Sequence, residues 1–124
     1  MKRCGFTLME VLIAVVIVGV LAGLAVPSYF KTIEKAKSSE ATANLKAIHL
    51  GQKIYKVDNN RFYGPQNAVA VINTNLNTDL TQENYTLAIT AAAANTYTAT
   101  ASRIGGTKVF TITETGLITE AGNY

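Results

Sequence analysis

The chain has 124 residues, which is room for one small domain. Lys and Arg number 11 against 8 Asp and Glu, and this formal net charge of +3 gives no support by itself for nucleic-acid binding. The one cysteine, Cys4, excludes an intrachain disulfide and any zinc site built from several thiolates.

The first predicted element is a membrane-spanning helix. Residues 11–30 carry no charge and are mostly aliphatic, and about 20 such residues are needed to cross ~30 Å of hydrocarbon. One carboxylate, Glu10, precedes this run, where an ionisable group is costly unless it is paired. A cleaved secretory signal, with the small residues Gly23 and Ala25 on either side of Leu24, or a plain single-span anchor would also explain the run. Neither alternative explains why a carboxylate lies at the start of the run.

The residues before this run match a processing signal. From Gly5 to Glu10 the sequence reads Gly-Phe-Thr-Leu-Met-Glu, and it resembles the class III signal of type IV pilins and type II secretion pseudopilins. The resemblance implies that a prepilin peptidase removes a leader of residues 1–5, cutting between Gly5 and Phe6, and that the amino group of Phe6 is then methylated. Met9 stands where isoleucine or valine is commoner, a change that conserves volume.

Loss of the leader would change the chemistry of the chain. Without Lys2 and Arg3 it keeps nine basic and eight acidic residues, so we expect no nucleic-acid partner. Without Cys4 it has no thiol, whereas many members of the family close their carboxyl-terminal region with a disulfide. The domain must therefore be held together by packing alone.

The assembly residue implied by the resemblance is Glu10. In the processed chain its carboxylate would lie one helical turn from the Phe6 ammonium, on the same face. The sequence leaves open whether the two pair within one helix or between neighbours, and the family resemblance favours the neighbour. Such a pair would set the axial register of a filament whose core is formed by aliphatic residues 11–26.

A flexible joint is predicted in the same helix. Gly19 and Gly23 form a Gly-x-x-x-Gly pair, which permits close helix packing or simply reflects a span rich in small residues. Pro27 lacks an N–H, so it should kink or locally open the helix. The family resemblance implies that the segment 19–27 can melt in the filament. We assign residues 6–30 to a transmembrane and filament-core helix, and 31–124 to a globular domain.

The second half of the helix, to about residue 57, is predicted to pack on a sheet. Its apolar residues recur at helical spacing: Ala41, Leu45, Ile48 and Tyr55 form one stripe, which Ala47, Leu50, Ile54 and Val57 widen. The solvated side carries Lys31, Glu34, Lys35, Lys37 and Glu40. His49 lies within this helix and has no evident activated partner, so we expect a surface histidine.

A turn and a long loop follow the helix. Residues 55–65 resemble the Tyr-x-x-Asp-Asn-Gly-x-Tyr-Pro junction of the family, except that Asn60 replaces the usual glycine and Gly64 precedes the proline. In the family, the region corresponding to 58–83 is a variable αβ-loop. Here we expect it to hold a short helix near residues 67–72.

The carboxyl-terminal part is predicted to be an antiparallel β-meander spanning residues 84–119. Alternating stretches cover 85–91, 96–102 and 108–113, and a last turn leads into 117–119. The predicted fold class is α+β: a long amino-terminal helix packed on a small antiparallel sheet of three to four strands.

No catalytic or cofactor-binding constellation is visible, so we do not expect an enzyme. Four scattered carboxylates offer no recognisable calcium loop: Asp79, Glu83, Glu114 and Glu120. The favoured function is a filament subunit of a type IV pilus or a secretion pseudopilus. It would reside in the inner membrane before assembly, and then in an extracellular filament or periplasmic pseudopilus built by the pilus or secretion machinery. The alternative is a membrane-anchored extracytoplasmic binding domain whose helix is only a tether.

Overall fold

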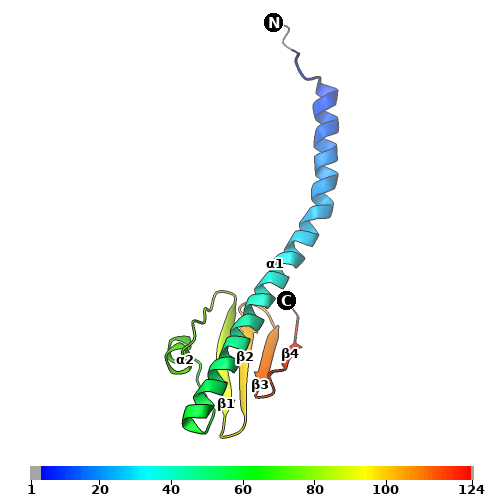
Figure 1. Ribbon diagram of the computed structural model, residues 1–124. Helices are drawn as coiled ribbons and strands as arrows, with labels where there is room; N and C mark the ends of the chain where they lie inside the picture. Colours follow the sequence, from blue (N-terminus) through cyan, green and yellow to red (C-terminus); the bar gives the residue numbers. More distant parts are fainter. Residues whose placement is uncertain (1–3, 124) are drawn as a thin grey trace. The chain divides into compact units, whose positions relative to one another are not determined.

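The computed structural model describes residues 4–123, and within them it has two helices and four strands (Figure 1). The elements are α1 (Leu8–Asn59), α2 (Val69–Leu76), β1 (Tyr85–Ala92), β2 (Tyr97–Arg103), β3 (Val109–Thr113) and β4 (Ile118–Ala121). The chain divides into two compact units, of which the first ends at Lys35 and the second begins at Ala36.

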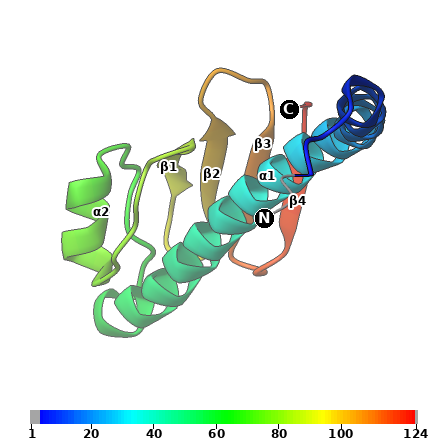
Figure 2. The ribbon, with the colours of Figure 1, turned by 90° about the horizontal axis from the view of Figure 1, so that it is seen from above.

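The second unit confirms the predicted α+β fold class. Its four strands form one antiparallel sheet in the order β1-β2-β3-β4, so each strand pairs with its neighbour in sequence. Figure 2 shows α1 lying across one face of this sheet. The strands agree with the predicted stretches to within a few residues, and β4 continues to Ala121.

The core lies between α1 and the sheet. Ala41, Leu45 and Ile48 are almost fully buried, as predicted from their helical spacing. The alternating strand residues that face them are also buried: Tyr85, Leu87, Ile89, Tyr97, Ala99, Ala101, Phe110 and Ile112. Burial of each larger aliphatic or aromatic side chain contributes about 1.5–3 kcal/mol, so this one layer can hold the unit together without a disulfide.

The predicted widening of the helical stripe is wrong for three residues. Leu50, Ile54 and Val57 are 62%, 65% and 83% exposed. Successive residues of an α-helix are about 100° apart, so Leu50 lies roughly 200° from Ile48, on the opposite side of α1. Only Ala47 of the widening group packs against the core.

A buried polar residue completes the stripe. Gln52 is fully buried and lies between Ile48 and Tyr55 in the helical repeat. Its Nε2 donates to the Tyr63 carbonyl and its Oε1 accepts from the Tyr63 N–H, both at 2.7 Å. The side chain thus satisfies both backbone groups of a loop residue, and it ties the loop after α1 to the helix.

The loop after α1 contains the predicted short helix, but later in the chain. α2 runs from Val69 to Leu76 instead of lying near 67–72, because its inward residues Ile72 and Leu76 are one turn apart and both are buried. Gly64, which precedes the proline and is not part of the usual junction of the family, has a structural reason to be glycine. Its φ is +122°, and a Cβ there would lie 2.6 Å from Cγ2 of Ile89, so only glycine fits.

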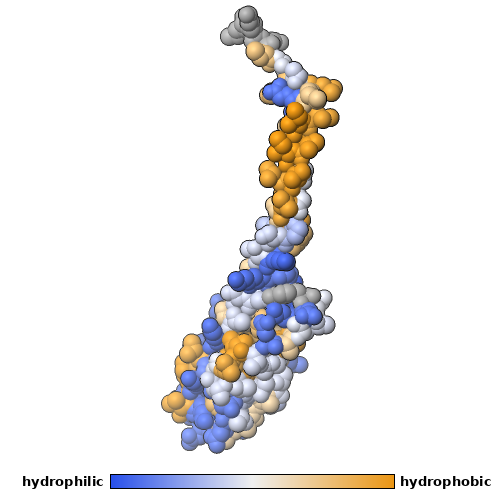
Figure 3. Space-filling model, turned by 90° about the vertical axis from the view of Figure 1, so that its right-hand side faces the viewer, coloured by the Kyte–Doolittle hydropathy of each residue, from blue (hydrophilic) through white to orange (hydrophobic). Residues whose placement is uncertain are grey.

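The first unit is the amino-terminal half of α1. Its aliphatic side chains are exposed (Figure 3), and α1 is long and apolar enough to cross a membrane by length and composition. The helix is unbroken at Pro27, so the structure shows no local opening there. Loss of one N–H interrupts one backbone hydrogen bond, and the remaining bonds on either side keep the helix continuous.

A fragment of residues 28–124 is expected to be soluble, monomeric and folded, because within residues 4–123 every buried residue lies at or after Ser38. Reducing agent should leave its melting temperature unchanged, since it contains no cysteine. Circular dichroism and size-exclusion chromatography measure both properties. A random-coil spectrum would show that the core needs the amino-terminal segment.

Candidate functional site

Thr7 and Glu10 cap the amino-terminal end of α1. The Glu10 N–H donates to Oγ1 of Thr7 at 3.2 Å, and the Thr7 N–H donates to Oε2 of Glu10 at 3.5 Å, the long end of the hydrogen-bond range. This reciprocal arrangement is a capping box. It also places a negative charge in the first turn, where the helix dipole favours one. The sequence analysis missed this role, although Thr-x-x-Glu before an apolar run is the signal that predicts it.

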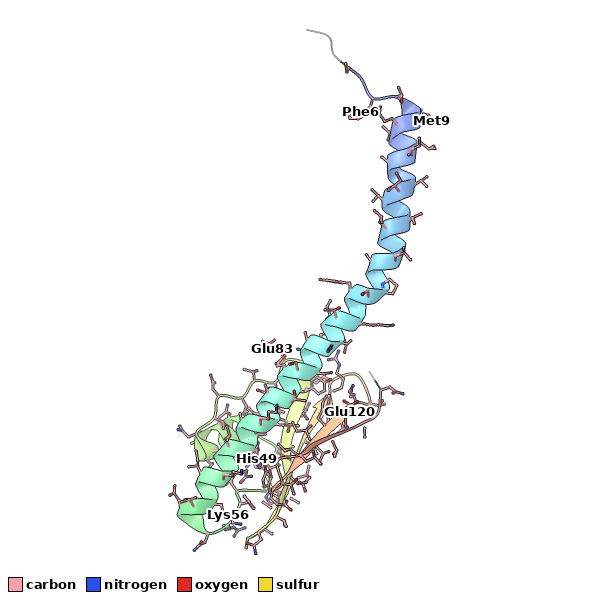
Figure 4. The ribbon with its side chains drawn as sticks, turned by 45° about the vertical axis from the view of Figure 1, so that its right-hand side comes forward. Phe6, Met9, His49, Lys56, Glu83 and Glu120 are labelled. Carbon is pink, nitrogen blue, oxygen red and sulfur yellow. The ribbon has the colours of Figure 1, made fainter. Side chains whose placement is uncertain are left out.

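The predicted cleavage site lies before the cap. Gly5 and Phe6 are outside the helix, Phe6 is 82% exposed, and nothing lies within 4 Å of the position a Cβ would take at Gly5 (Figure 4). The bond between these two residues is therefore open to a peptidase. The basic residues Lys2 and Arg3 of the predicted leader lie outside the described residues.

An uninterrupted apolar surface begins beside Glu10. Leu8, Val11, Leu12, Val15 and Val16 line a shallow hollow on α1 and are all more than half exposed. When lipid or other helices cover this surface, the Glu10 carboxylate is desolvated together with it. A carboxylate in such surroundings is strongly disfavoured unless it is paired.

The carboxylate can cap the helix and accept a further donor. An ionised carboxylate has about four lone-pair sites, and within the described chain its one side-chain hydrogen bond is the long one from the Thr7 N–H. An ammonium group can therefore bind Glu10 while the cap stays in place. If the chain is cut between Gly5 and Phe6, the nearest such group belongs to Phe6, either of the same chain or of a neighbour.

The joint residues Gly19 and Gly23 lie on an open part of the surface of α1. A Cβ at either position would meet nothing within 4 Å. Nothing within one subunit therefore requires glycine here, which agrees with a packing role between helices of different subunits. Their role, and the predicted joint that ends at Pro27, stay predictions.

His49 is not the surface histidine that we predicted. It is half-buried, and its Nδ1 lies 2.6 Å from the hydroxyl of the buried Tyr97. Burial, with a smaller contribution from the Lys53 charge, lowers the pKa of His49. Burial and the Glu114 charge raise the pKa of Tyr97. Which of the two groups donates the hydrogen bond depends on the tautomer of the imidazole. The pair is a hydrogen bond at the edge of the core, between α1 and β2.

The four scattered carboxylates do not form a metal site among residues 4–123, where no three His, Cys, Asp or Glu side chains come together. Glu120 lies 3.6 Å from the Lys108 ammonium, and Glu114 accepts the Tyr97 backbone N–H. Glu83 and Glu120 occupy separate positions in Figure 4.

Comparison with known proteins gives two family matches. A family model described as type IV minor pilin ComP, DNA uptake sequence receptor, matches residues 27–111, and one described as prokaryotic N-terminal methylation motif matches residues 1–26. The type IV wide pilus major component PilA4 of Thermus thermophilus is 35% identical over 109 residues, covering 88% of this chain and 80% of that protein.

Two further relatives match over a shorter stretch. The type IV major pilin protein PilA of Myxococcus xanthus is 41% identical over 61 residues, 49% of this chain and 28% of that protein. The type II secretion system core protein G of Aeromonas hydrophila is 41% identical over 61 residues, 49% of this chain and 43% of that protein. In both cases the matched stretch covers less than half of the relative.

Proposed function

Because the chain belongs to the type IV pilin family, whose members are filament-forming structural subunits, we propose how this subunit enters its filament. It is made as a precursor anchored in the inner membrane by α1. A prepilin peptidase cuts it between Gly5 and Phe6, and the pilus machinery then inserts it into a helical fibre. There Glu10 pairs with the methylated Phe6 ammonium of a neighbouring subunit.

The observation that carries this proposal is the exposed apolar half of α1 with one carboxylate at its start. A helix that is apolar all round is stable in lipid or among similar helices, so both environments of the proposed life cycle suit residues 8–26. In either one Glu10 requires a counter-charge. The Phe6 ammonium is the group that processing would create beside it.

We favour a pilus subunit over a secretion pseudopilin. The match to the pilus component of Thermus thermophilus covers 88% of this chain, so it extends through much of the globular domain. The match to core protein G covers only 49%. Similarity in the domain, and not only in the shared helix, is what distinguishes the two classes.

We do not extend DNA binding to this chain, although the matching family model is described as a DNA uptake sequence receptor. Residues 36–124 contain seven Lys and Arg and six Asp and Glu. Neutralisation of phosphates by a basic surface supplies most of the affinity of proteins for DNA. The domain has an excess of only one positive charge, which is too small to supply this affinity.

Replacing Gly5 by leucine is expected to block processing, because a side chain before the cut would fill space that the peptidase reserves for glycine. The precursor should stay in the membrane with its leader attached, and no fibre should form. Mass analysis of the amino-terminal peptide from the native host measures the outcome: methylated Phe6 in the natural chain and retained residues 1–5 in Gly5→Leu. Normal leader removal from the variant would contradict the assignment.

A further inference from the structure

Among the residues of the four described strands, none of those directed to the face of the sheet opposite α1 is charged. The strand residues on this face alternate with the buried ones, and most of them bear a hydroxyl group. We call this surface the threonine face; it consists of Thr86, Ala88, Thr90, Ala91, Thr98, Thr100, Ser102, Val109, Thr111, Thr113, Thr119 and Ala121. The only charged strand residues, Arg103 and Glu120, lie at a strand end and on the α1 side, where Glu120 pairs with Lys108.

The hydroxyl groups of the threonine face form a regular array. Thr100 of β2 lies opposite Thr111 of β3, which lies opposite Thr119 of β4, and Thr98 lies opposite Thr113. Neighbouring strands are about 4.8 Å apart, and next-but-one residues of a strand about 6.7 Å apart. Within residues 4–123, the hydroxyls of Thr100 and Thr111, at the centre of the face, make no side-chain hydrogen bond. They are available to a group outside the chain.

Such a face is complementary to a second copy of itself. A hydroxyl group is both donor and acceptor, so two identical hydroxyl arrays can bond to one another, whereas two identical charged faces would repel. Threonine is β-branched and stiff, so little side-chain freedom is lost on contact. Protein surfaces normally intersperse charged residues to prevent association. In residues 36–123 the charged residues lie on α1, in the loops, at the end of β2 and, for Glu120, on the α1 side of β4.

We propose that the threonine face is the surface through which copies of this chain in neighbouring filaments associate laterally. The inference rests on the proposed function, because α1 then occupies the filament interior and leaves the opposite face of the sheet free. One such contact is weak, since it buries short side chains. A filament repeats the face at every subunit, and many weak contacts act together when their geometry permits simultaneous engagement.

The test places like charges at the centre of the face. Thr100→Lys combined with Thr111→Lys should leave filament yield unchanged, because both side chains are directed away from the core and their repulsion across the two strands costs only about 1 kcal/mol or less. Natural filaments sheared from the cells should form bundles that sediment at low speed. The lysine variant should give single filaments, with the sedimented share reduced about tenfold or more through repeated like-charge contacts.

Three controls distinguish this effect from misfolding. Bundles of the lysine variant should return at about 1 M salt, where the Debye length falls to ~3 Å. They should also form when lysine filaments are mixed with filaments of Thr100→Glu and Thr111→Glu. Ala70→Lys with Ala94→Lys adds the same charge at exposed positions of α2 and the β1–β2 loop, and it should leave bundling intact.

Low-salt bundling of the lysine variant at the natural level would overturn the inference. Natural filaments that stay single under all conditions would also overturn the inference, and so would single filaments that bind a neutral polysaccharide through this face. Both outcomes would leave the proposed function intact. Absence of filaments from the natural strain would overturn the proposed function and this inference together.

Discussion

Replacing Glu10 by leucine is expected to abolish filaments while membrane insertion and leader removal continue. Leucine enters lipid more readily than a carboxylate does, so the precursor should accumulate normally. In the fibre, however, the Phe6 ammonium of a neighbour would lose its counter-charge. Loss of one partner from a poorly solvated ion pair costs roughly 3–5 kcal/mol, and a filament repeats that loss at every subunit. Electron microscopy of sheared surface material and an immunoblot of membranes measure the two outcomes.

Two further variants separate the charge of Glu10 from its role as a helix cap. Glu10→Gln keeps an oxygen that can accept the Thr7 N–H but has no charge, so it should also fail to form filaments. Thr7→Ala removes the side-chain cap, at a cost of about 1 kcal/mol, and keeps the charge, so filaments should still form. Abundant normal filaments from Glu10→Leu would contradict the proposed pairing and would leave Glu10 as a remnant of the processing signal.

Replacing Gln52 by leucine is expected to destabilise the globular unit more than any surface change. The variant loses two hydrogen bonds and leaves the N–H and carbonyl of Tyr63 without their partner in a part-buried region. Each unsatisfied buried group costs about 1–3 kcal/mol, so we expect a loss of roughly 2–5 kcal/mol. At about 4–8 °C per kcal/mol for a domain of this size, the melting temperature of the 28–124 fragment should fall by about 8 °C or more.

The adjacent residue provides the matched control. Lys53 is exposed on the same helix, and Lys53→Gln should change stability by less than about 0.5 kcal/mol. A Gln52→Leu fragment that melts at the natural temperature would show that the loop after α1 does not depend on the Gln52–Tyr63 contact.

The sequence predicted the elements of the fold well because most of its signals are periodic. Alternation located the strands, and the spacing of Ala41, Leu45 and Ile48 located the buried side of α1. Two errors arose where hydrophobicity was read without its angular position. Leu50 was predicted to be buried because it is hydrophobic, and Gln52 was overlooked because it is polar. The helical repeat nevertheless places Gln52 on the buried side of α1 and Leu50 on the exposed side.

The polar contacts could be predicted only in part. The capping box of Thr7 and Glu10 is local, and the Thr-x-x-Glu pattern announces it. The hydrogen bond of His49 to Tyr97 joins residues 48 positions apart, and no local pattern brings them together. The threonine face could not be predicted without the register of the strands, because the hydroxyl array depends on Thr100 lying opposite Thr111.

The most direct measurement of the assembly mechanism is a cryo-electron microscopy reconstruction of the natural filament at side-chain resolution. The proposed function predicts that the apolar half of α1 lies in the filament core. It also predicts that the Glu10 carboxylate lies within about 4 Å of the Phe6 nitrogen of a neighbouring subunit, the range of an ion pair. A Glu10 carboxylate that pairs only with Phe6 of its own chain, or that faces solvent, would contradict the proposed pairing.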